Sequence, residues 1–438
     1  MLLLIFVFRP IFDLAWNTNF FWGLNLSGII ALFTIVLMIM YICFHKKIRV
    51  DRTLQWGMVY AFHIGVVTLI NMQTYSELNY FLRLLSEMAF LLIVPRKLTR
   101  KELERCILLF LIATLVPIVI TYLQDMGICS FTYFDTVSRR KINRGSGGYR
   151  QPSVLTRFCT IGLLYAFYLL ERKKNIGIRI FLYVYMVMNV IAVFLSYHRT
   201  GYLLVVIIIV MWFYLKEKER FIKMLKGMFL MGSALIILFI IVYNVGIIAV
   251  DLSILESMFS LDNVVTISES GKMTLVLRGR GSLLEVLLQG MRENPWYYTF
   301  FGNGVNTNRV SGIKMTFADM EIIRVLWNGG ILGGGIWLLH FGNMRIAIQK
   351  QKNNSHVKDI YRLATCMFWV FILWGITIET TNSPNLMYHV YVICGLLCND
   401  TNVQRLSEKE NYTLNGKRNF AIVKSLRCEE NEFCGGIE

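Results

Sequence analysis

Apolar residues along this chain of 438 residues gather into long runs, and short polar segments separate the runs. Several runs are long enough for a helix to cross a hydrocarbon core of about 30 Å, for example 20–44, 104–124 and 227–250. The runs do not alternate at a period of two, as the strands of a membrane barrel would. The pattern therefore predicts an all-α polytopic membrane protein.

The pattern predicts about twelve transmembrane helices. Their expected ranges are 2–16, 20–44, 54–72, 78–95, 104–124, 153–170, 178–195, 201–215, 227–250, 319–341, 361–379 and 385–398. The first run is short and contains Arg9 and Asp13. It is either a helix tucked against the bundle or a span whose true start lies upstream.

Composition and charge add an orientation to this picture. The chain is 55% hydrophobic with a formal net charge of +17, and its mean hydropathy is +0.53. Every second loop is short and basic, such as "HKKIRVDR" at 45–52, whereas 71–77 and 380–385 carry no cation. Such loops are retained in the cytoplasm, which predicts that both termini are cytoplasmic. The cations therefore signal membrane topology, and we expect no nucleic-acid partner.

Two loops on the outer side break this rule. Residues 125–152 and 251–318 are basic, and the second is a large loop between the ninth and tenth spans. The predicted organisation is a transmembrane region over 1–250 that includes the loop 125–152, the loop 251–318, C-terminal transmembrane helices over 319–398 and a cytoplasmic tail over 399–438.

Several outer-side cations are candidates for binding a diphosphate. Arg199 follows His198 in the turn "SYHRTG", Arg157 lies about one turn inside a span, and Arg280 precedes apolar residues spaced as in a short amphipathic helix. Guanidinium groups match phosphate oxygens bidentately, and a lipid diphosphate would lie at this depth. Further predicted substrate-binding residues are Arg150, Arg278 and Arg292. The alternatives are that Arg199 snorkels or caps the carbonyls of 192–195, and that the cluster 139–144 is a solvated or lipid-headgroup-binding patch.

Transfer from a diphosphate requires a base to take the proton of an acceptor hydroxyl. Asp319 is the candidate, because it lies where the long loop re-enters the membrane and the helix dipole favours its ionised form. A plain helix cap is the competing interpretation. Glu321 is a second candidate for substrate binding, and it could instead pair with Arg324. The glycines of "NGGILGGG" are expected only to permit close helix packing.

The sequence predicts neither a metal site nor a cofactor. No C-x-x-C pair has a matching Cys or His pair, so the nine cysteines suggest no zinc site and no disulfide framework. A G-x-x-x-x-G-K-[ST] phosphate loop is also absent from the sequence.

These motifs, in this order, resemble the O-antigen ligase/polymerase superfamily of bacterial inner-membrane proteins. "SYHRTGYLL" is similar to the family's Ser-x-x-Arg-Thr/Ala-Gly turn, and "FRPIFD" is similar to a first-span ending of surface-polysaccharide polymerases. In the family, a long periplasmic loop follows with an arginine, an amphipathic helix and a Pro…Gly-x-Gly turn. The counterparts here are Arg280, "GSLLEVLLQGMREN", Pro295, Gly302 and Gly304, and then Gly330, Ile331 and Gly333 for a Gly-Ile-x-Gly element.

The resemblance implies metal-independent glycosyl transfer on the periplasmic face. Family members move a glycan from undecaprenyl diphosphate either to another lipid-linked repeat unit or to lipid A–core. Arg199 and Arg280 would then hold the donor diphosphate, and a chain-length regulator would be a further candidate partner. Asp319 falls near the position of the ligases' catalytic histidine, but 251–318 contains no histidine. This departure favours a polymerase over a ligase, and the stretched Pro-to-Gly spacing leaves the loop geometry open.

Transport is the alternative from another functional class. A lipid-linked oligosaccharide flippase or an ion-coupled transporter would be expected to have related halves, interrupted helices near the midplane and ionisable groups at mid-span. The sequence predicts no such repeat and no interrupted helix, and only Arg83 and Glu87 are ionisable near mid-span. These two are expected to form an ion pair at i,i+4.

Overall fold

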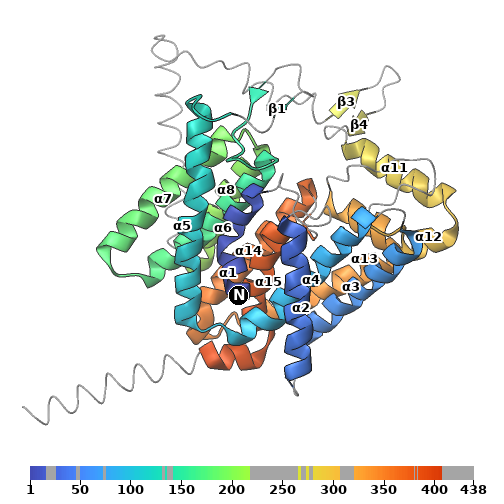
Figure 1. Ribbon diagram of the computed structural model, residues 1–438, viewed down its shortest axis with the longest axis horizontal. Helices are drawn as coiled ribbons and strands as arrows, with labels where there is room; N and C mark the ends of the chain where they lie inside the picture. The colour runs from blue at the N-terminus through green and yellow to red at the C-terminus, as the bar shows by residue number, and fades with distance from the viewer. Residues whose placement is uncertain are drawn as a thin grey trace, which may run out of the picture.

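The computed structural model of the chain describes residues 1–15, 26–45, 50–72, 75–130, 134–135, 142–217, 265–267, 273–275, 280–305, 320–378, 380–381 and 383–406. Within these ranges the protein is helical, with two short antiparallel strand pairs (Figure 1). The predicted span 227–250 and most of the loop 251–318 lie outside the described residues.

Eight described helices are long and apolar enough to cross a membrane. They are α2 (Leu26–Phe44), α3 (Arg52–Asn71), α5 (Arg100–Asp125), α6 (Pro152–Arg172), α7 (Ile176–Leu195), α8 (Arg199–Lys216), α13 (Glu321–Lys350) and α14 (Lys358–Thr377, preceded by the 3-10 turn Ser355–Val357). Their outward side chains are apolar: Leu203 and Val206 of α8, for example, are each 58% exposed. The protein is therefore a multi-pass membrane protein by helix length and composition.

Three further helices complete the bundle: α1 (Leu2–Phe12), α4 (Tyr75–Lys97) and α15 (Pro384–Cys398). α1 has 11 residues and continues into the 3-10 turn Asp13–Ala15. At a rise of 1.5 Å per residue it is about 16 Å long, roughly half a hydrocarbon core, and it packs against α5. α15 is buried along almost its whole length at the centre of the bundle.

Polar contacts at the helix ends show that neighbouring helices alternate in direction, as the loop charges predict. Glu171, near the end of α6, forms ion pairs with Lys216 at the end of α8 (3.4 Å) and Arg362 near the start of α14 (2.7 Å). We call this end of the bundle the basic end. At the opposite end, Arg157 near the start of α6 contacts Asn385 at the start of α15.

The helix α13 is interrupted at Gly330, where φ is 62° and ψ is −165°. Only glycine adopts this backbone conformation readily. The prediction that "NGGILGGG" merely permits close packing is therefore incomplete, and the prediction of no interrupted helix is wrong at this position. The break divides α13 into a segment before Gly330 and a longer segment after it.

The predicted short helix after Gly281 is confirmed as α11 (Arg280–Glu293), which the helix α12 (Trp296–Phe301) follows. α11 packs against α12 and α13 on the side of the bundle away from α7 and α8 (Figure 1). The strand pairs are β1 (Phe134–Asp135) with β2 (Ile142–Asn143), and β3 (Val265–Ile267) with β4 (Met273–Leu275). These short strands are exceptions to the predicted all-α fold. The first pair belongs to the predicted outer loop 125–152, and the second pair belongs to the predicted outer loop 251–318.

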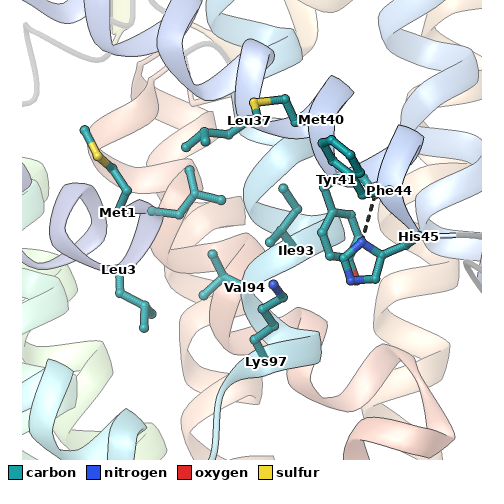
Figure 2. Close-up of a pocket in the computed structure, with 11 residues that line it drawn as sticks. Met1, Leu3, Leu37, Met40, Tyr41, Phe44, His45, Ile93, Val94 and Lys97 are labelled. Carbon is teal, nitrogen blue, oxygen red and sulfur yellow. Dashed lines mark hydrogen bonds between the residues drawn. The ribbon is translucent and has the colours of Figure 1, made fainter.

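An apolar cavity of about 340 Å³ lies between α1, α2 and α4. Figure 2 shows Leu37, Ile93 and Val94 around it, with Lys97 at its margin. The Lys97 amine lies 5.3 Å from the centroid of the Tyr41 ring. Because the C-terminal ends of α2 and α4 line this cavity, it belongs to the basic end and not to the end that carries the predicted site residues.

Candidate functional site

The segment 196–201, "SYHRTG", forms a tight turn between α7 and α8. Tyr197 has a φ of 48°, the left-handed conformation that commonly ends helices. His198 is the N-cap of α8, and its Nδ1 accepts a hydrogen bond from the backbone N–H of Gly201 at 3.3 Å. The neutral imidazole therefore carries its proton on Nε2. This turn fixes Arg199 as the first residue of α8, at the end opposite the basic end.

The carbonyl groups at the end of α7 already accept hydrogen bonds from other groups. The donors are the backbone N–H and hydroxyl of Ser196, the N–H of Tyr197, the hydroxyl of Tyr202 and the N–H of Gly145. The end of α7 is thus capped without a guanidinium group. Capping of residues 192–195 therefore does not require Arg199, and its role there stays a prediction.

Arg157 lies in the second turn of α6 and is only 7% exposed. Its Nη1 donates a hydrogen bond to Oδ1 of Asn385 at 3.1 Å, and its guanidinium carbon lies 5.8 Å from the centroid of the Trp374 ring. The ring of His198 lies 5.4 Å from the same Trp374, whose indole N–H donates to Thr160 at 3.3 Å. Trp374 therefore links Arg157 to the turn that carries Arg199.

Arg144 is a third arginine near this turn. The next residue, Gly145, donates its backbone N–H to the carbonyl of Leu195 at 3.0 Å, which ties the loop to the end of α7. Arg144 and Arg199 both act electrostatically on the hydroxyl of Tyr202. We refer to Arg144, Arg157, His198 and Arg199 as the cationic cluster.

The loop that carries Arg144 is seated in the bundle by buried hydrogen bonds. Oε1 of Gln124 accepts from the backbone N–H groups of Ser146 and Gly147, each at 3.1 Å. The Tyr149 hydroxyl donates to the carbonyl of Pro10 at 2.7 Å, and burial raises the pKa of this phenol well above its ordinary value. Residues 144–149 are therefore a packed element of the site. The other cations of the predicted patch, Arg139, Arg140 and Lys141, lie outside the described residues.

Glu321 is the first residue of α13 and is 4% exposed. Its Oε2 accepts from the backbone N–H groups of Thr380 at 2.6 Å and Thr381 at 3.2 Å, and its Oε1 accepts from the Thr381 hydroxyl. Trp337 also donates to that hydroxyl, at 3.0 Å. The carboxylate therefore fastens α13 to the segment before α15, four residues from Asn385. These contacts assign Glu321 a positioning role, and direct substrate binding stays a prediction.

The turn 302–305 fills the break in α13, which brings together two motifs of the family resemblance. The freed carbonyls of α13 accept from four donors. The Trp327 carbonyl accepts from the N–H (3.0 Å) and the side-chain amide (3.2 Å) of Asn303, the Asn328 carbonyl from the Gly304 N–H (2.9 Å), and the Gly329 carbonyl from Nε2 of His63 (2.9 Å). A Cβ on Gly330 would lie 2.4 Å from the carbonyl oxygen of Phe300. Glycine is therefore required here both by conformation and by the close approach of the turn.

The "FRPIFD" segment contributes a buried ion pair beside α15. Arg9 is 2% exposed, pairs with Asp13 at 2.8 Å and donates to the Ser27 hydroxyl at 2.8 Å. Its guanidinium carbon lies 5.3 Å from the centroid of the Tyr388 ring. Tyr388 follows Asn385 by three residues, so the partners of Arg9 and Arg157 share one face of α15.

Of the predicted site residues, the structure brings together Arg157, His198 and Arg199. Arg150 is exposed at the end of the loop before α6, and Arg292 is exposed on α11, which lies across the bundle from α7 and α8 (Figure 1). Arg280 begins α11, but its side chain lies outside the described residues, as do Arg278 and Asp319.

Sequence reasoning missed Trp374 and Asn385 and did not single out Arg144. A usable signal for the first two was the alternation of helix direction, which places the end of α14 and the start of α15 beside the "SYHRTG" turn. The contact of Arg144 had no such signal, because it depends on how the loop folds back onto α7.

Among the described residues, no group of three or more His, Cys, Asp or Glu side chains is placed to hold a metal ion. The cluster is instead suited to binding an anion through guanidinium groups. Neither a protein-family model nor a curated protein matches the chain.

Proposed function

We propose that the protein is a polysaccharide polymerase of the O-antigen ligase/polymerase superfamily. It would extend undecaprenyl-diphosphate-linked repeat units into O-antigen, capsule or exopolysaccharide. In this proposal it lies in the bacterial inner membrane with about twelve spans and cytoplasmic termini, and residues 125–152 and 251–318 face the periplasm. The observation that supports the proposal is that the buried Arg157, the turn that carries Arg199 and the loop that carries Arg144 meet at one end of the bundle.

The chemistry of a lipid diphosphate suits this cluster. Arginine side chains near the hydrocarbon region are costly and commonly mark functional sites, so three of them at one end of the bundle favour a polyanionic ligand. Arg199 is the first residue of α8, so the backbone N–H groups of the first turn of this helix lie near its side chain. A helix N-terminus also favours an anion. In the proposed site Arg199 and Arg280 bind the donor diphosphate, while Asn385 and Trp374 hold Arg157 in place.

The proposed reaction is a single displacement at the anomeric carbon of the donor sugar. The acceptor hydroxyl forms the new C–O bond, and the bond to the diphosphate breaks. Undecaprenyl diphosphate leaves with the electron pair, and its developing charge is stabilised by the arginines. Asp319 is the proposed base for the hydroxyl proton. Glu321 acts indirectly, by holding α13 to the segment that precedes α15.

The test is polymer formation in vesicles that contain the purified protein and lipid-linked repeat units. We expect a ladder of lengthening lipid-linked products from the wild type. Removal of one guanidinium that stabilises the leaving group should slow transfer roughly 10²–10³-fold, so Arg199→Ala, Arg280→Ala and Arg157→Ala are the test variants, with Asp319→Asn for the base. Arg179→Ala is the matched control, because Arg179 is an exposed cation at the basic end. Each variant must elute as a folded, monodisperse protein.

The same experiment separates the competing functions. Transfer of single glycans to lipid A–core alone would establish a ligase. No covalent transfer, together with movement of labelled lipid across the bilayer, would establish a flippase. The interruption of α13 is the observation that favours a flippase, because broken helices are common at transporter sites. However, the protein's own turn 302–305 and His63 occupy the freed carbonyls, so the break presents no binding groups to a cargo.

A further inference from the structure

A second cavity, which is polar, lies at the basic end of the bundle, opposite the end that carries the cationic cluster. It has a volume of about 760 Å³ and is formed by the C-terminal ends of α8 and α13 and by the N-terminal half of α14. Four cations line it: Arg345, Lys352, Lys358 and Arg362. Among the described residues no carboxylate lines it, although Glu171 pairs with Arg362.

Several donors in the cavity wall make no hydrogen bond within the described part of the chain. They are Nη1 of Arg345, Nε of Arg362 and Oγ1 of Thr365. Thr365 is 2% exposed, and burying a polar group without a partner is costly. Arg362 uses Nη1 and Nη2 on Glu171, at 3.0 and 2.7 Å, and its Nε has no partner among the described residues. These three unpartnered donors belong to residues that line one cavity, and a ligand with several acceptor oxygens would satisfy them.

The same cavity has an apolar, membrane-facing margin. Trp369 is 39% and Tyr214 47% exposed, as aromatic side chains at a membrane–water boundary often are. Trp369 also lies 5.6 Å from the guanidinium carbon of Arg345. Met211 and Leu215 of α8 line the opposite wall. The lining therefore combines phosphate-binding cations with a surface for hydrocarbon chains.

We propose that this cavity binds the phosphate group of an anionic phospholipid, with its acyl chains against α8 and α14. A phosphate accepts bidentately from Arg345, and a second phosphate of the same lipid reaches Lys352 and Lys358, which form no ion pair among the described residues. Basic pockets between transmembrane helices on the cytoplasmic side are a recognised form of lipid site. This inference does not depend on the proposed glycosyl transfer.

The test is lipid retention by the full-length protein, measured by native mass spectrometry at increasing lipid concentration. The probes are cardiolipin with two phosphates, phosphatidylglycerol with one, and zwitterionic phosphatidylethanolamine. We expect cardiolipin to bind most tightly and phosphatidylethanolamine least. Loss of one cation near the membrane surface should weaken cardiolipin binding about fivefold, which is the effect expected of Arg345→Gln. The double variant Lys352→Gln/Lys358→Gln should lower the affinity for cardiolipin about 25-fold.

Two further variants keep the test decisive. Lys350→Gln removes the same charge from an exposed position that does not line the cavity, so it should change affinity less than about twofold. Thr365→Val removes only the buried hydroxyl, and it carries the test if Arg345→Gln fails to fold. Equal retention of all three lipids, or equal losses in Lys350→Gln and Arg345→Gln, would overturn the proposal. Binding of inorganic pyrophosphate that cardiolipin does not displace would assign the cavity to a soluble anion and also overturn it.

Discussion

The interruption of α13 offers the sharpest test of the packing, through the substitution Gly330→Ala. An alanine at φ 62° and ψ −165° costs about 1–3 kcal/mol in backbone strain. Its Cβ would lie 2.4 Å from the Phe300 oxygen and 2.5 Å from the Gly302 nitrogen, so the turn 302–305 must withdraw. Three hydrogen bonds from this turn to α13 are then lost, at about 1 kcal/mol each. We expect the free energy of unfolding to fall by about 4–6 kcal/mol.

The matched control is Gly335→Ala, one helical turn further along α13. A Cβ on Gly335 meets nothing within 4 Å, and alanine favours a helix over glycine by about 1 kcal/mol. Both variants and the wild type would be heated in one detergent, and the remaining monodisperse protein measured by size exclusion. Gly330→Ala should melt well below the wild type, and Gly335→Ala at or above it. Equal melting temperatures for the two variants would refute the assigned role of Gly330.

Two further predictions concern the supports of the cationic cluster. Tyr149→Phe removes the hydrogen bond to Pro10 and should lower the free energy of unfolding by about 1 kcal/mol, whereas Tyr183→Phe, at a position 51% exposed, should not change it. Denaturation in detergent checks this, and equal stability of both variants would contradict it. Glu321→Gln turns an amide N–H₂ toward backbone donors and should cost about 1–3 kcal/mol. A positioning role requires transfer and melting temperature to fall together; lost transfer at unchanged stability would show that Glu321 contacts the substrate.

The positions of the helices were largely predictable from the sequence. Long apolar runs must form helices in a membrane because no other partner satisfies their backbone groups, so the predicted span 201–215 matches α8 closely. The charges of the loops similarly predicted the alternation of helix direction that the ion pairs of Glu171 show. The same rules gave no clear answer for 2–16. Its apolar residues favour a span, whereas its short length and its charged residues, Arg9 and Asp13, argue against one.

The break at Gly330 could not be predicted from its neighbours. "NGGILGGG" fits an unbroken, closely packed helix equally well, and the observed φ depends on a turn that arrives from 302–305. A local pattern does not encode such a tertiary contact.

The candidate site also combines features that the local sequence predicts with features that depend on tertiary packing. Helix direction places Arg157 and Arg199 at one end of the bundle. The rotation of α14 and α15, which points Trp374 and Asn385 toward Arg157, depends on packing on all sides of these buried helices. Hydropathy does not specify that rotation, because a helix that is apolar all round has no face that its sequence singles out.

The filled break in α13 also has a consequence for how the protein is assembled during synthesis. Unpaired carbonyl groups inside a bilayer cost several kcal/mol each, so the break cannot persist before its donors are in place. His63 belongs to α3, which is made far earlier, whereas the turn 302–305 precedes α13 by only a short stretch of chain. All these donors are therefore synthesised before α13 emerges, and the broken conformation of α13 is stable only when they reach it. Insertion of α13 and docking of the turn are thus expected to be coupled.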